Sequence, residues 1–311
     1  MFKSNLFFLR RLFPLLFFLL ILSCGKGKEE EILGSSSNPI KIYFTPSIDA
    51  GAIASNSAEF LKFLEEETKY YFKSGIPSSY ITVVEALGSK RADVAVMNSF
   101  GYLLAHQKYG AEARITVIRN GHKFYKGQII AHIDSGINKI EDIQGKRFAF
   151  TDSSSTSGYL FPMKILKEHG VEPGNTVFGM KHDNVVTMVY QRQVDAGATF
   201  HSPPDENGNI KDARSLVLTQ FPDAAEKIKI IAVTEDIMND PFVFRKDLPG
   251  EITEKVIAAI LKFMDTEAGK KVFKTIYGVD GVVRSSDADY DGLRKMVEIN
   301  KIDPAELLRK K

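Results

Sequence analysis

Short apolar runs alternate with longer amphipathic segments along most of the chain. Apolar runs bounded by turn residues are typical of strands, whereas apolar positions three and four residues apart predict helices. The first pattern predicts strands at residues 39–46, 92–97, 115–118, 128–133, 147–151, 176–180, 196–199, 228–233 and 241–244. The second predicts helical segments at residues 50–72, 81–87, 101–108, 140–143, 159–169, 183–192, 251–264, 267–276 and 288–309. This alternation predicts an α/β fold with mainly parallel sheets.

The order of these elements predicts two lobes. One lobe begins with residues 39–132, and the second comprises residues 133–238. The chain then returns to the first lobe over residues 239–311. The crossings are expected near residues 132–134 and 235–240, where two short segments form a hinge. A ligand is therefore expected in the cleft between the lobes.

The N-terminus has the pattern of a secretory signal. Residues 1–23 carry three basic residues and no acidic one, and they end in a short apolar run. Cys24 is the only cysteine of the chain and follows Ile21-Leu22-Ser23, which resembles a bacterial lipobox. We therefore expect cleavage before Cys24 and lipid attachment at that residue, which places the protein in the periplasm or on the surface of a bacterium. An ordinary secretory signal that ends in cysteine is the alternative.

The charge balance limits the partners of the mature protein. The chain has 41 Lys and Arg residues and 39 Asp and Glu residues, and loss of the signal leaves 38 against 39. A near-neutral chain without a basic patch gives no support for nucleic-acid binding. Residues 24–38 are polar and rich in Ser and Gly, so we expect a flexible tether between membrane and domain.

The segment DSSSTSGYLFP, residues 152–162, lies between a predicted strand and a predicted helix. The first N–H groups of a helix have no intrahelical partner and carry partial positive charge. The hydroxyls of Ser155, Thr156 and Ser157 add further donors, so this helix start predicts a site for a tetrahedral oxyanion. Gly158 is expected to let the backbone approach the ligand. The alternative is an ordinary helix cap or loop.

Other polar residues are expected at the same cleft. Helices begin at carboxyl ends of strands, where ligands bind in α/β folds, and two further helix starts carry Tyr80 and His182. Asp240 lies in a hinge-like segment. A carboxylate repels an oxyanion unless the anion carries a proton or an amine, so Asp240 favours phosphorus oxyanions with a P–OH over sulfate. The alternatives are a core tyrosine, a capping histidine and a turn aspartate.

Several segments resemble the periplasmic substrate-binding proteins of phosphate, phosphite and phosphonate ABC transporters. The shared segments are ADVAVMNSFGY, DSSSTSGYLFP, the HD of KHDNVVTMVYQRQVDAG, and NDPFVFRKDLP, which span most of residues 40–285. The resemblance implies a two-lobed type II periplasmic-binding-protein fold with a two-segment hinge and Venus-flytrap closure. It also implies oxyanion contacts at Tyr80, Ser155, Thr156, Ser157 and His182, and an acidic contact at Asp240.

The chain departs from the family pattern in two places. Members that bind aminophosphonates carry a carboxylate just after the VDA strand, whereas residues 199–204 contain no acid. Several members have an aromatic residue after the AD-x-A strand, whereas this chain has Met97 and Asn98. Both departures argue against 2-aminoethylphosphonate and favour phosphate, phosphite or a small alkylphosphonate. Asn98 and His201 are further candidate contacts, with simple packing as the alternative for His201.

We predict a non-enzymatic, monomeric solute receptor that delivers a phosphorus oxyanion to an ABC permease and holds neither cofactor nor metal. A lipoprotein sensor with the same pocket remains open, as does a binding protein for a sulfonate, a thiamine precursor or another small molecule. A hydrolase would need a nucleophile among residues 155–157 and His182 as its base. The chain has no GxSxG motif for that chemistry, and its histidines lack HxH or HExxH spacing.

Overall fold

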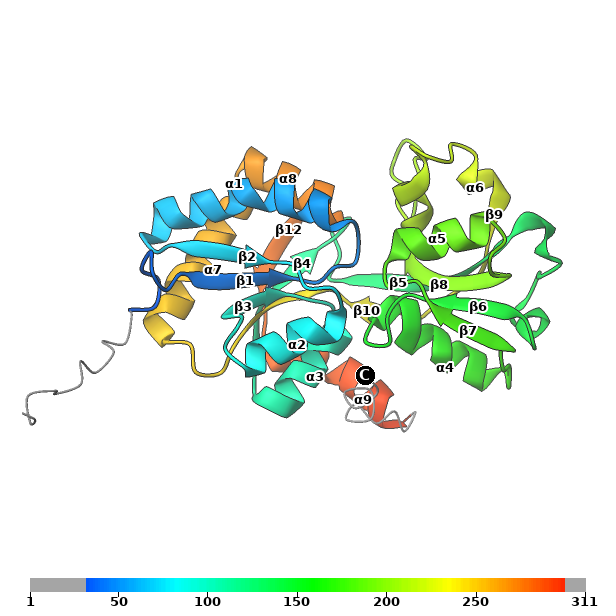
Figure 1. Cartoon of the computed structure of the whole chain (residues 1–311), viewed down its shortest axis with the longest axis horizontal. Helices are drawn as coiled ribbons and strands as arrows, with labels where there is room; N and C mark the ends of the chain where they lie inside the picture. Colours follow the sequence, from blue (N-terminus) through cyan, green and yellow to red (C-terminus); the bar gives the residue numbers. More distant parts are fainter. Residues whose placement is uncertain (1–31, 300–311) are drawn as a thin grey trace, which may run out of the picture.

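The computed structural model describes residues 32–299, which form two α/β lobes (Figure 1). The predicted signal at residues 1–23, the lipidation residue Cys24 and the end of the predicted C-terminal helix lie outside the described residues. Within residues 32–299, no helix has the length and apolar character needed to cross a bilayer.

Strands and helices alternate along the described chain, as the sequence predicts. The strands are β1 Ile40–Phe44, β2 Phe72–Gly75, β3 Val94–Val96, β4 Glu112–Ile118, β5 Phe124–His132, β6 Arg147–Phe150, β7 Asn175–Phe178, β8 Ala196–His201, β9 Ile228–Val233, β10 Ile237–Met238, β11 Pro241–Phe244 and β12 Gly281–Arg284. The α-helices are α1 Ala50–Thr68, α2 Tyr80–Gly88, α3 Ser99–Tyr109, α4 Phe161–Glu168, α5 His182–Tyr190, α6 Ala224–Lys227, α7 Gly250–Asp265, α8 Glu267–Tyr277 and α9 Asp291–Ile299. A single π-helical turn, η3 Thr156–Leu160, precedes α4.

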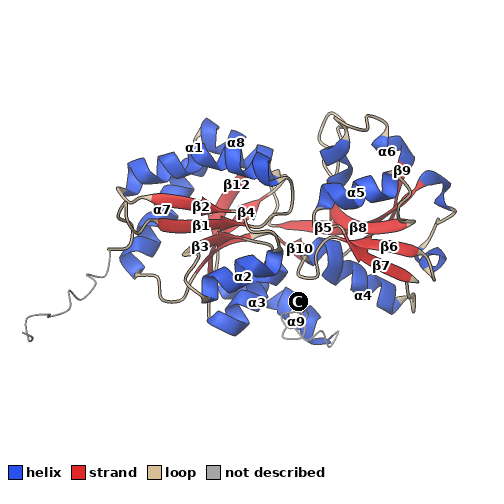
Figure 2. Ribbon diagram, in the orientation of Figure 1, coloured by secondary structure: helices blue, strands red, loops and turns tan. Residues whose placement is uncertain are grey.

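Each lobe contains one mixed sheet (Figure 2). The first sheet has the order β12-β4-β11-β3-β1-β2, and the second has the order β10-β5-β8-β6-β7 with β9 also paired to β5. Strands β1, β2 and β3 are parallel, as are β6, β7 and β8. Strands β4, β5, β9, β10, β11 and β12 make antiparallel pairs. The prediction of mainly parallel sheets is therefore wrong, because the strands beside the crossings run against the parallel sets.

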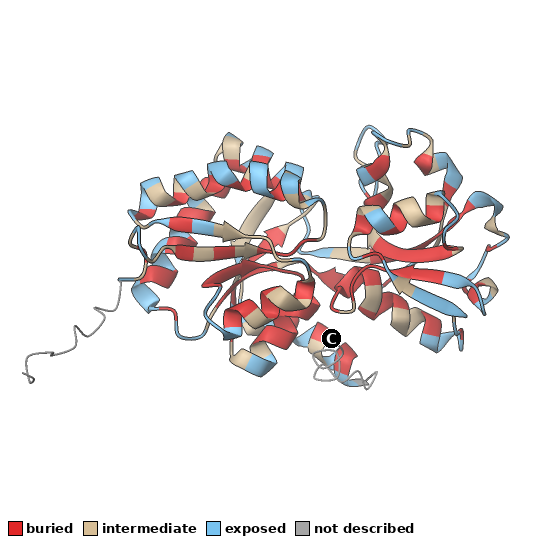
Figure 3. Ribbon diagram, viewed as in Figure 1, coloured by how far each residue is buried: buried red, intermediate tan, exposed pale blue. Residues whose placement is uncertain are grey.

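Helices cover both faces of each sheet and bury the strands between them (Figure 3). In the first lobe, α1, α7 and α8 cover one face, while α2, α3 and α9 cover the other. Successive residues of a strand point to opposite faces. Accordingly, Phe242 and Phe244 of β11 join the core beneath α1, whereas Val243 joins the core above α2 and α3. Burial of a phenylalanine side chain contributes about 1.5–3 kcal/mol, so these layers fix the lobe.

The helix predicted at residues 50–72 ends early. Its C-cap, Lys69, has a left-handed backbone with φ of 64°, and the chain then enters β2 at Phe72. The backbone N–H of Phe72 donates to the Glu65 carboxylate (2.9 Å), which fixes this turn. The amphipathic pattern continues through the turn, so the sequence did not reveal β2. It also did not reveal the short elements β10, β12 and α6.

The prediction of a flexible tether over residues 24–38 is wrong for residues 33–38, while residues 24–31 lie outside the described residues. Leu33 packs against the core of the first lobe. The Gly34 carbonyl accepts the backbone N–H of Tyr71 (2.8 Å), and the Gly34 N–H donates to the Asn38 carbonyl (2.8 Å). Residues 33–38 therefore form a turn that is attached to the first lobe.

The first crossing between the lobes lies earlier than predicted. Strand β5 pairs with β8 and β9, so it belongs to the second lobe and the crossing spans residues 119–123 instead of 132–134. The return crossing lies between β10 and β11, within the predicted residues 235–240. Asn239 joins the two crossings, because its side-chain amide donates to the carbonyls of Val117 (3.1 Å) and His122 (2.9 Å). Periodicity identified β5 as a strand but could not specify its partners.

Candidate functional site

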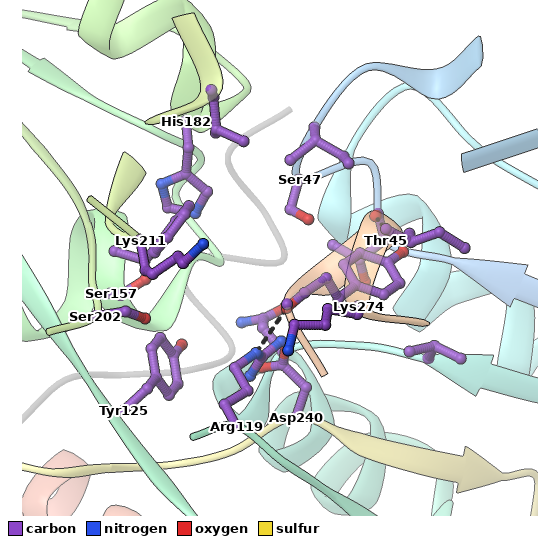
Figure 4. Close-up of a pocket in the computed structure, with 18 of the residues that line it drawn as sticks. Thr45, Ser47, Arg119, Tyr125, Ser157, His182, Ser202, Lys211, Asp240 and Lys274 are labelled. Atoms are coloured by element: carbon purple, nitrogen blue, oxygen red, sulfur yellow. Dashed lines mark hydrogen bonds and ion pairs between the residues drawn. The ribbon is translucent and has the colours of Figure 1, made fainter. Parts of the chain in front are cut away.

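A cavity of about 350 Å³ lies between the lobes beside the two crossing segments (Figure 4). Both lobes contribute polar side chains to its wall. The sequence-predicted residues that line it are Tyr80, Asn98, Ser155, Ser157, His182 and Asp240. Side chains from distant parts of the chain thus share one cavity, whereas Thr156 and His201 lie outside its wall.

The loop after β6 places Ser155 and Ser157 on this wall. The Asp152 carboxylate accepts the backbone N–H of Ser154 (2.8 Å), which closes a tight turn before the helix. Ser155 is the N-cap of η3, and its Oγ accepts the backbone N–H of Gly158 (3.1 Å). The Ser155 hydroxyl therefore keeps its own proton for a ligand.

Backbone N–H groups at the predicted helix starts are partly used inside the protein. The His182 N–H donates to the Ser47 carbonyl of the opposite lobe (3.2 Å). Burial raises the pKa of the Asp152 carboxyl, and hydrogen bonds from the backbone N–H groups of Ser154 and of Tyr80, at the start of α2, offset only part of that rise. Because these backbone N–H groups are already bonded within the protein, side chains supply more of the hydrogen-bonding groups in the cavity than the helix starts predicted.

Several buried polar atoms on the cavity wall have no hydrogen-bond partner among the described residues. They are Tyr80 Oη, Thr45 Oγ1, Asn98 Oδ1 and Asp240 Oδ1. Burial, followed by the nearby Asp152 charge, raises the pKa of Tyr80 well above its ordinary value, so its phenol remains a donor. A buried polar group without a partner costs about 1–3 kcal/mol, and a ligand that supplied partners would recover this free energy.

Arg119 and Asp240 form an ion pair at the hinge. Arg119 Nη2 lies 2.7 Å from Asp240 Oδ2, and the two side chains are only 13% and 20% exposed. The same guanidinium donates to the Tyr277 carbonyl (2.9 Å) and to Asn239 Oδ1 (3.1 Å). One oxygen of the Asp240 carboxylate is thus neutralised, while the other, Oδ1, is an unused acceptor.

Sequence reasoning missed Arg119, because it placed the first crossing after β5. Arg119 directly follows β4 and precedes Asn120-Gly121, a pair typical of a turn. That turn signal could have placed the crossing correctly. Other missed wall residues are Thr45, Ser47, Tyr125, Lys211, Lys274 and Tyr277.

His182 is a neutral, buried donor or acceptor at the start of α5. Burial is the main cause that lowers the pKa of His182 to about 3, and the Arg119 charge lowers it further. Its Nδ1 lies 3.3 Å from Thr151 Oγ1. The ring packs edge-on against Phe200, with 5.0 Å between the centroids. Figure 4 shows the imidazole pointing into the cavity from the second lobe.

Thr156 bridges the lobes beside the cavity. Its Oγ1 accepts the backbone N–H of Phe100 (2.9 Å) and the side-chain amide of Asn98 (3.0 Å). Asn98 also donates to the Ser154 carbonyl (2.7 Å). Thr156 Oγ1 also lies 3.2 Å from Ser99 Oγ, so the hydroxyl is used within the protein. Thr156 therefore caps α3 from the opposite lobe.

The structure does not place His201 on the cavity wall, and it adds an acidic residue that the sequence analysis did not consider. His201 lines a separate pocket, and its Nδ1 lies 2.9 Å from Gln128 Oε1. The segment at residues 199–204 contains no acid, yet Asp205, the next residue, does line the main cavity. Its carboxylate is paired with Lys211 (3.1 Å) and accepts from Asn209 (3.0 Å). An acidic side chain therefore lines the cavity close to this segment, although Lys211 already neutralises it.

Gly158 is required for the packing of the loop. A Cβ at this position would lie 2.2 Å from Thr151 Oγ1 and 2.5 Å from Thr151 Cβ. Because Thr151 is fully buried, Gly158→Ala is expected to lower the free energy of unfolding by about 1–3 kcal/mol. In the matched control Gly250→Ala, nothing lies within 4 Å of the added Cβ, and we expect little change. Urea denaturation measures the free energy of unfolding of both variants. Equal values for Gly158→Ala and Gly250→Ala would contradict the prediction.

Among residues 32–299, no group of three or more His, Cys, Asp or Glu residues is arranged to hold a metal ion. The cavity instead presents hydroxyls, a phenol, an imidazole and the Arg119–Asp240 pair. This chemistry suits the binding of a small polar anion by hydrogen bonds.

The chain is similar to known substrate-binding proteins in sequence and fold. The family model for the periplasmic substrate-binding protein of phosphonate ABC transporters matches residues 42–290. The Phosphate-import protein PhnD of Mycolicibacterium smegmatis is 24% identical over 280 residues, which cover 82% of this chain and 83% of the relative.

Solved structures share the fold at low sequence identity. A binding protein component of an ABC phosphonate transporter from Pseudomonas aeruginosa has a TM-score of 0.75 and 21% identity, covering 85% of this chain and 87% of that one. PhnD1 from Prochlorococcus marinus, in complex with methylphosphonate, has a TM-score of 0.72 and 18% identity, covering 85% and 98%. The predicted type II periplasmic-binding-protein fold is confirmed.

Proposed function

The chain belongs to the periplasmic substrate-binding proteins of phosphonate ABC transporters, and on this premise we propose that it binds a small phosphorus oxyanion, in a form that carries a P–OH, for an ABC permease. Its role is binding rather than catalysis. The proposal rests on four buried polar atoms that line the cavity and have no hydrogen-bond partner among the described residues: Thr45 Oγ1, Tyr80 Oη, Asn98 Oδ1 and Asp240 Oδ1.

The donors and the acceptor of the cavity match such a ligand. Ser155 and Tyr80 each have a hydroxyl proton to donate to a phosphoryl oxygen. Asp240 Oδ1 has a free lone pair for a P–OH. Sulfate at neutral pH has no proton to donate, so its oxygens would face the Asp240 carboxylate without compensation. The cavity therefore favours phosphorus over sulfur oxyanions.

The cavity also has room for a small substituent on phosphorus. Its volume of about 350 Å³ is within the range of pockets for small organic ligands. Ile48, Phe200 and Leu216 contribute apolar surface to its wall. Phosphate, phosphite and small alkylphosphonates are the ligands that we propose. The names of the similar proteins support this class, since one is a phosphate-import protein and another was solved with methylphosphonate.

We also propose that the protein is exported and anchored by a lipid. The support is the sequence alone: a charged and apolar segment at residues 1–23, followed by Cys24 after Ile21-Leu22-Ser23. Mass spectrometry of the mature protein from its native membrane would show a diacylglyceryl-modified Cys24 at the N-terminus. An unmodified N-terminus at another residue would contradict this part of the proposal.

Ligand binding is expected to raise the melting temperature. A ligand at a concentration 100 times its Kd stabilises the folded protein by about 2.7 kcal/mol. We expect millimolar phosphate, phosphite or methylphosphonate to give a clear increase, with sulfate giving a smaller one. Differential scanning fluorimetry of the purified protein in a phosphate-free buffer measures this. Absence of an increase with every phosphorus ligand would contradict the proposed function.

A further inference from the structure

We infer that Thr151 sets the tautomer of His182, a residue of the cavity wall, so that Nε2, the ring nitrogen that does not contact Thr151, accepts hydrogen bonds. His182 is then a second selector for ligands that carry a proton, on the wall contributed by the second lobe. The inference rests on the proposed function, because it concerns the same cavity. Thr151 acts as a positioning residue, since its own side chain is absent from the cavity wall.

Thr151 is held rigidly at the end of β6. It is fully buried. Its N–H donates to the Gly158 carbonyl (3.0 Å), and its carbonyl accepts the N–H of Met180 (2.7 Å). The backbone of Gly158 packs directly against its side chain, with no room even for a Cβ. The Thr151 hydroxyl therefore has a fixed position between its two neighbours.

Those two neighbours determine where the protons lie. Thr151 Oγ1 is 3.1 Å from the Ala198 carbonyl oxygen and 3.3 Å from His182 Nδ1. A carbonyl only accepts, and a hydroxyl has one proton, so that proton goes to Ala198. The Thr151 oxygen can then only accept from His182, which requires a proton on Nδ1. The opposite assignment would leave two oxygen acceptors facing each other without a proton.

A neutral imidazole has only one N–H, so a proton on Nδ1 leaves Nε2 with a lone pair. The ring is neutral because it is buried, which lowers the pKa of His182 to about 3, with Arg119 as a further cause. Packing against Phe200 and the bond from its backbone to Ser47 hold the ring in place. His182 therefore presents an acceptor where a simple oxyanion site would present a donor.

The cavity then has acceptors on opposite walls, His182 Nε2 from the second lobe and Asp240 Oδ1 from the hinge. A monoanionic phosphonate can donate its P–OH to either one, and dihydrogen phosphate can donate to both. Sulfate and sulfonate anions can donate to neither, so both lone pairs repel them. The substrate class is thereby narrowed to phosphorus oxyanions in their hydroxyl-bearing monoanionic forms.

Methylphosphonate and methanesulfonate form a matched pair of probes, because they have the same shape and only the first carries an acidic hydroxyl. Thr151→Val removes the hydroxyl at similar volume. We expect the His182 ring in this variant to be able to carry its proton on Nε2. The Kd of methanesulfonate divided by the Kd of methylphosphonate should then fall about tenfold relative to wild type. Thr151→Ser should retain the wild-type ratio. Isothermal titration calorimetry of the full mature chain measures these constants.

Two outcomes overturn the inference in different ways. An unchanged ratio in Thr151→Val, with wild type binding methylphosphonate, refutes the tautomer argument and leaves the proposed function intact. Failure of wild type to bind methylphosphonate, phosphate or phosphite refutes the proposed function and, with it, the inference.

A direct measurement needs only the wild-type protein. Long-range ¹H–¹⁵N correlation NMR of protein labelled with ¹⁵N-histidine distinguishes a protonated ring nitrogen from an unprotonated one. We expect His182 to show protonated Nδ1 and unprotonated Nε2 in the absence of ligand. A protonated Nε2 would refute the inference whatever the stability of the variants.

Discussion

Arg119→Met is expected to lower affinity for methylphosphonate about 100-fold and to destabilise the fold by about 3–5 kcal/mol. Arg119 neutralises Asp240 within a largely buried hinge, where the two side chains are 13% and 20% exposed. Removal of one partner from a buried ion pair leaves an uncompensated charge, which carries a cost of this size. The remaining Asp240 charge would also repel the anionic ligand. Urea denaturation and calorimetric titration measure the two effects.

A double-mutant cycle separates the ion pair from other contacts of Arg119. The guanidinium also donates to Tyr277 and Asn239, and those bonds are lost in Arg119→Met whatever residue stands at 240. We expect Arg119→Met combined with Asp240→Asn to be more stable than Arg119→Met alone, because no bare carboxylate remains. Additive destabilisation in the double variant would contradict a coupled pair.

Asp240→Asn is expected to reduce discrimination between phosphorus and sulfur oxyanions. Hydrogen bonds to a charged acceptor contribute about 1.5–3 kcal/mol, so loss of the Oδ1 carboxylate should weaken methylphosphonate binding about 10- to 100-fold. Sulfate should lose less affinity or gain some, because the repulsive charge is removed. Parallel titrations with both ligands measure the change in the ratio of their Kd values.

The matched control for Asp240→Asn is Asp265→Asn, which makes the same change at an exposed position at the end of α7. It should leave both affinities unchanged. Equal losses for methylphosphonate and sulfate in Asp240→Asn would show that the carboxylate does not recognise the ligand's proton. In that case Asp240 would serve only to hold Arg119.

The candidate site could be predicted from sequence where its residues follow local rules. Tyr80, Ser155 and His182 lie at helix starts after strands, and the carboxyl edge of a sheet collects such residues. All three line the cavity. Thr156 has the same local pattern, yet its hydroxyl is used between the lobes. The pattern identified the loop but not the direction of each side chain.

The hinge shows why the remaining site residues were missed. Arg119 meets Asp240 across 121 positions of the chain. No local pattern links two such positions, because their contact depends on which sheet β5 joins. That choice is made by the pairing of β5 with β8 and β9 in the second lobe. The sequence instead predicted the crossing after β5, and Arg119 was consequently overlooked.

By itself the sequence determined the α/β class, most helices and strands, and the donor-rich loop at Ser155, because these depend on interactions between residues near one another in the chain. Only the tertiary structure decided that Arg119 joins Asp240, that Thr156 caps α3, and that Thr151 contacts His182. The reason is physical: the hydrogen bonds and burial of these groups come from partners far along the chain, which are specified only once both sheets have packed.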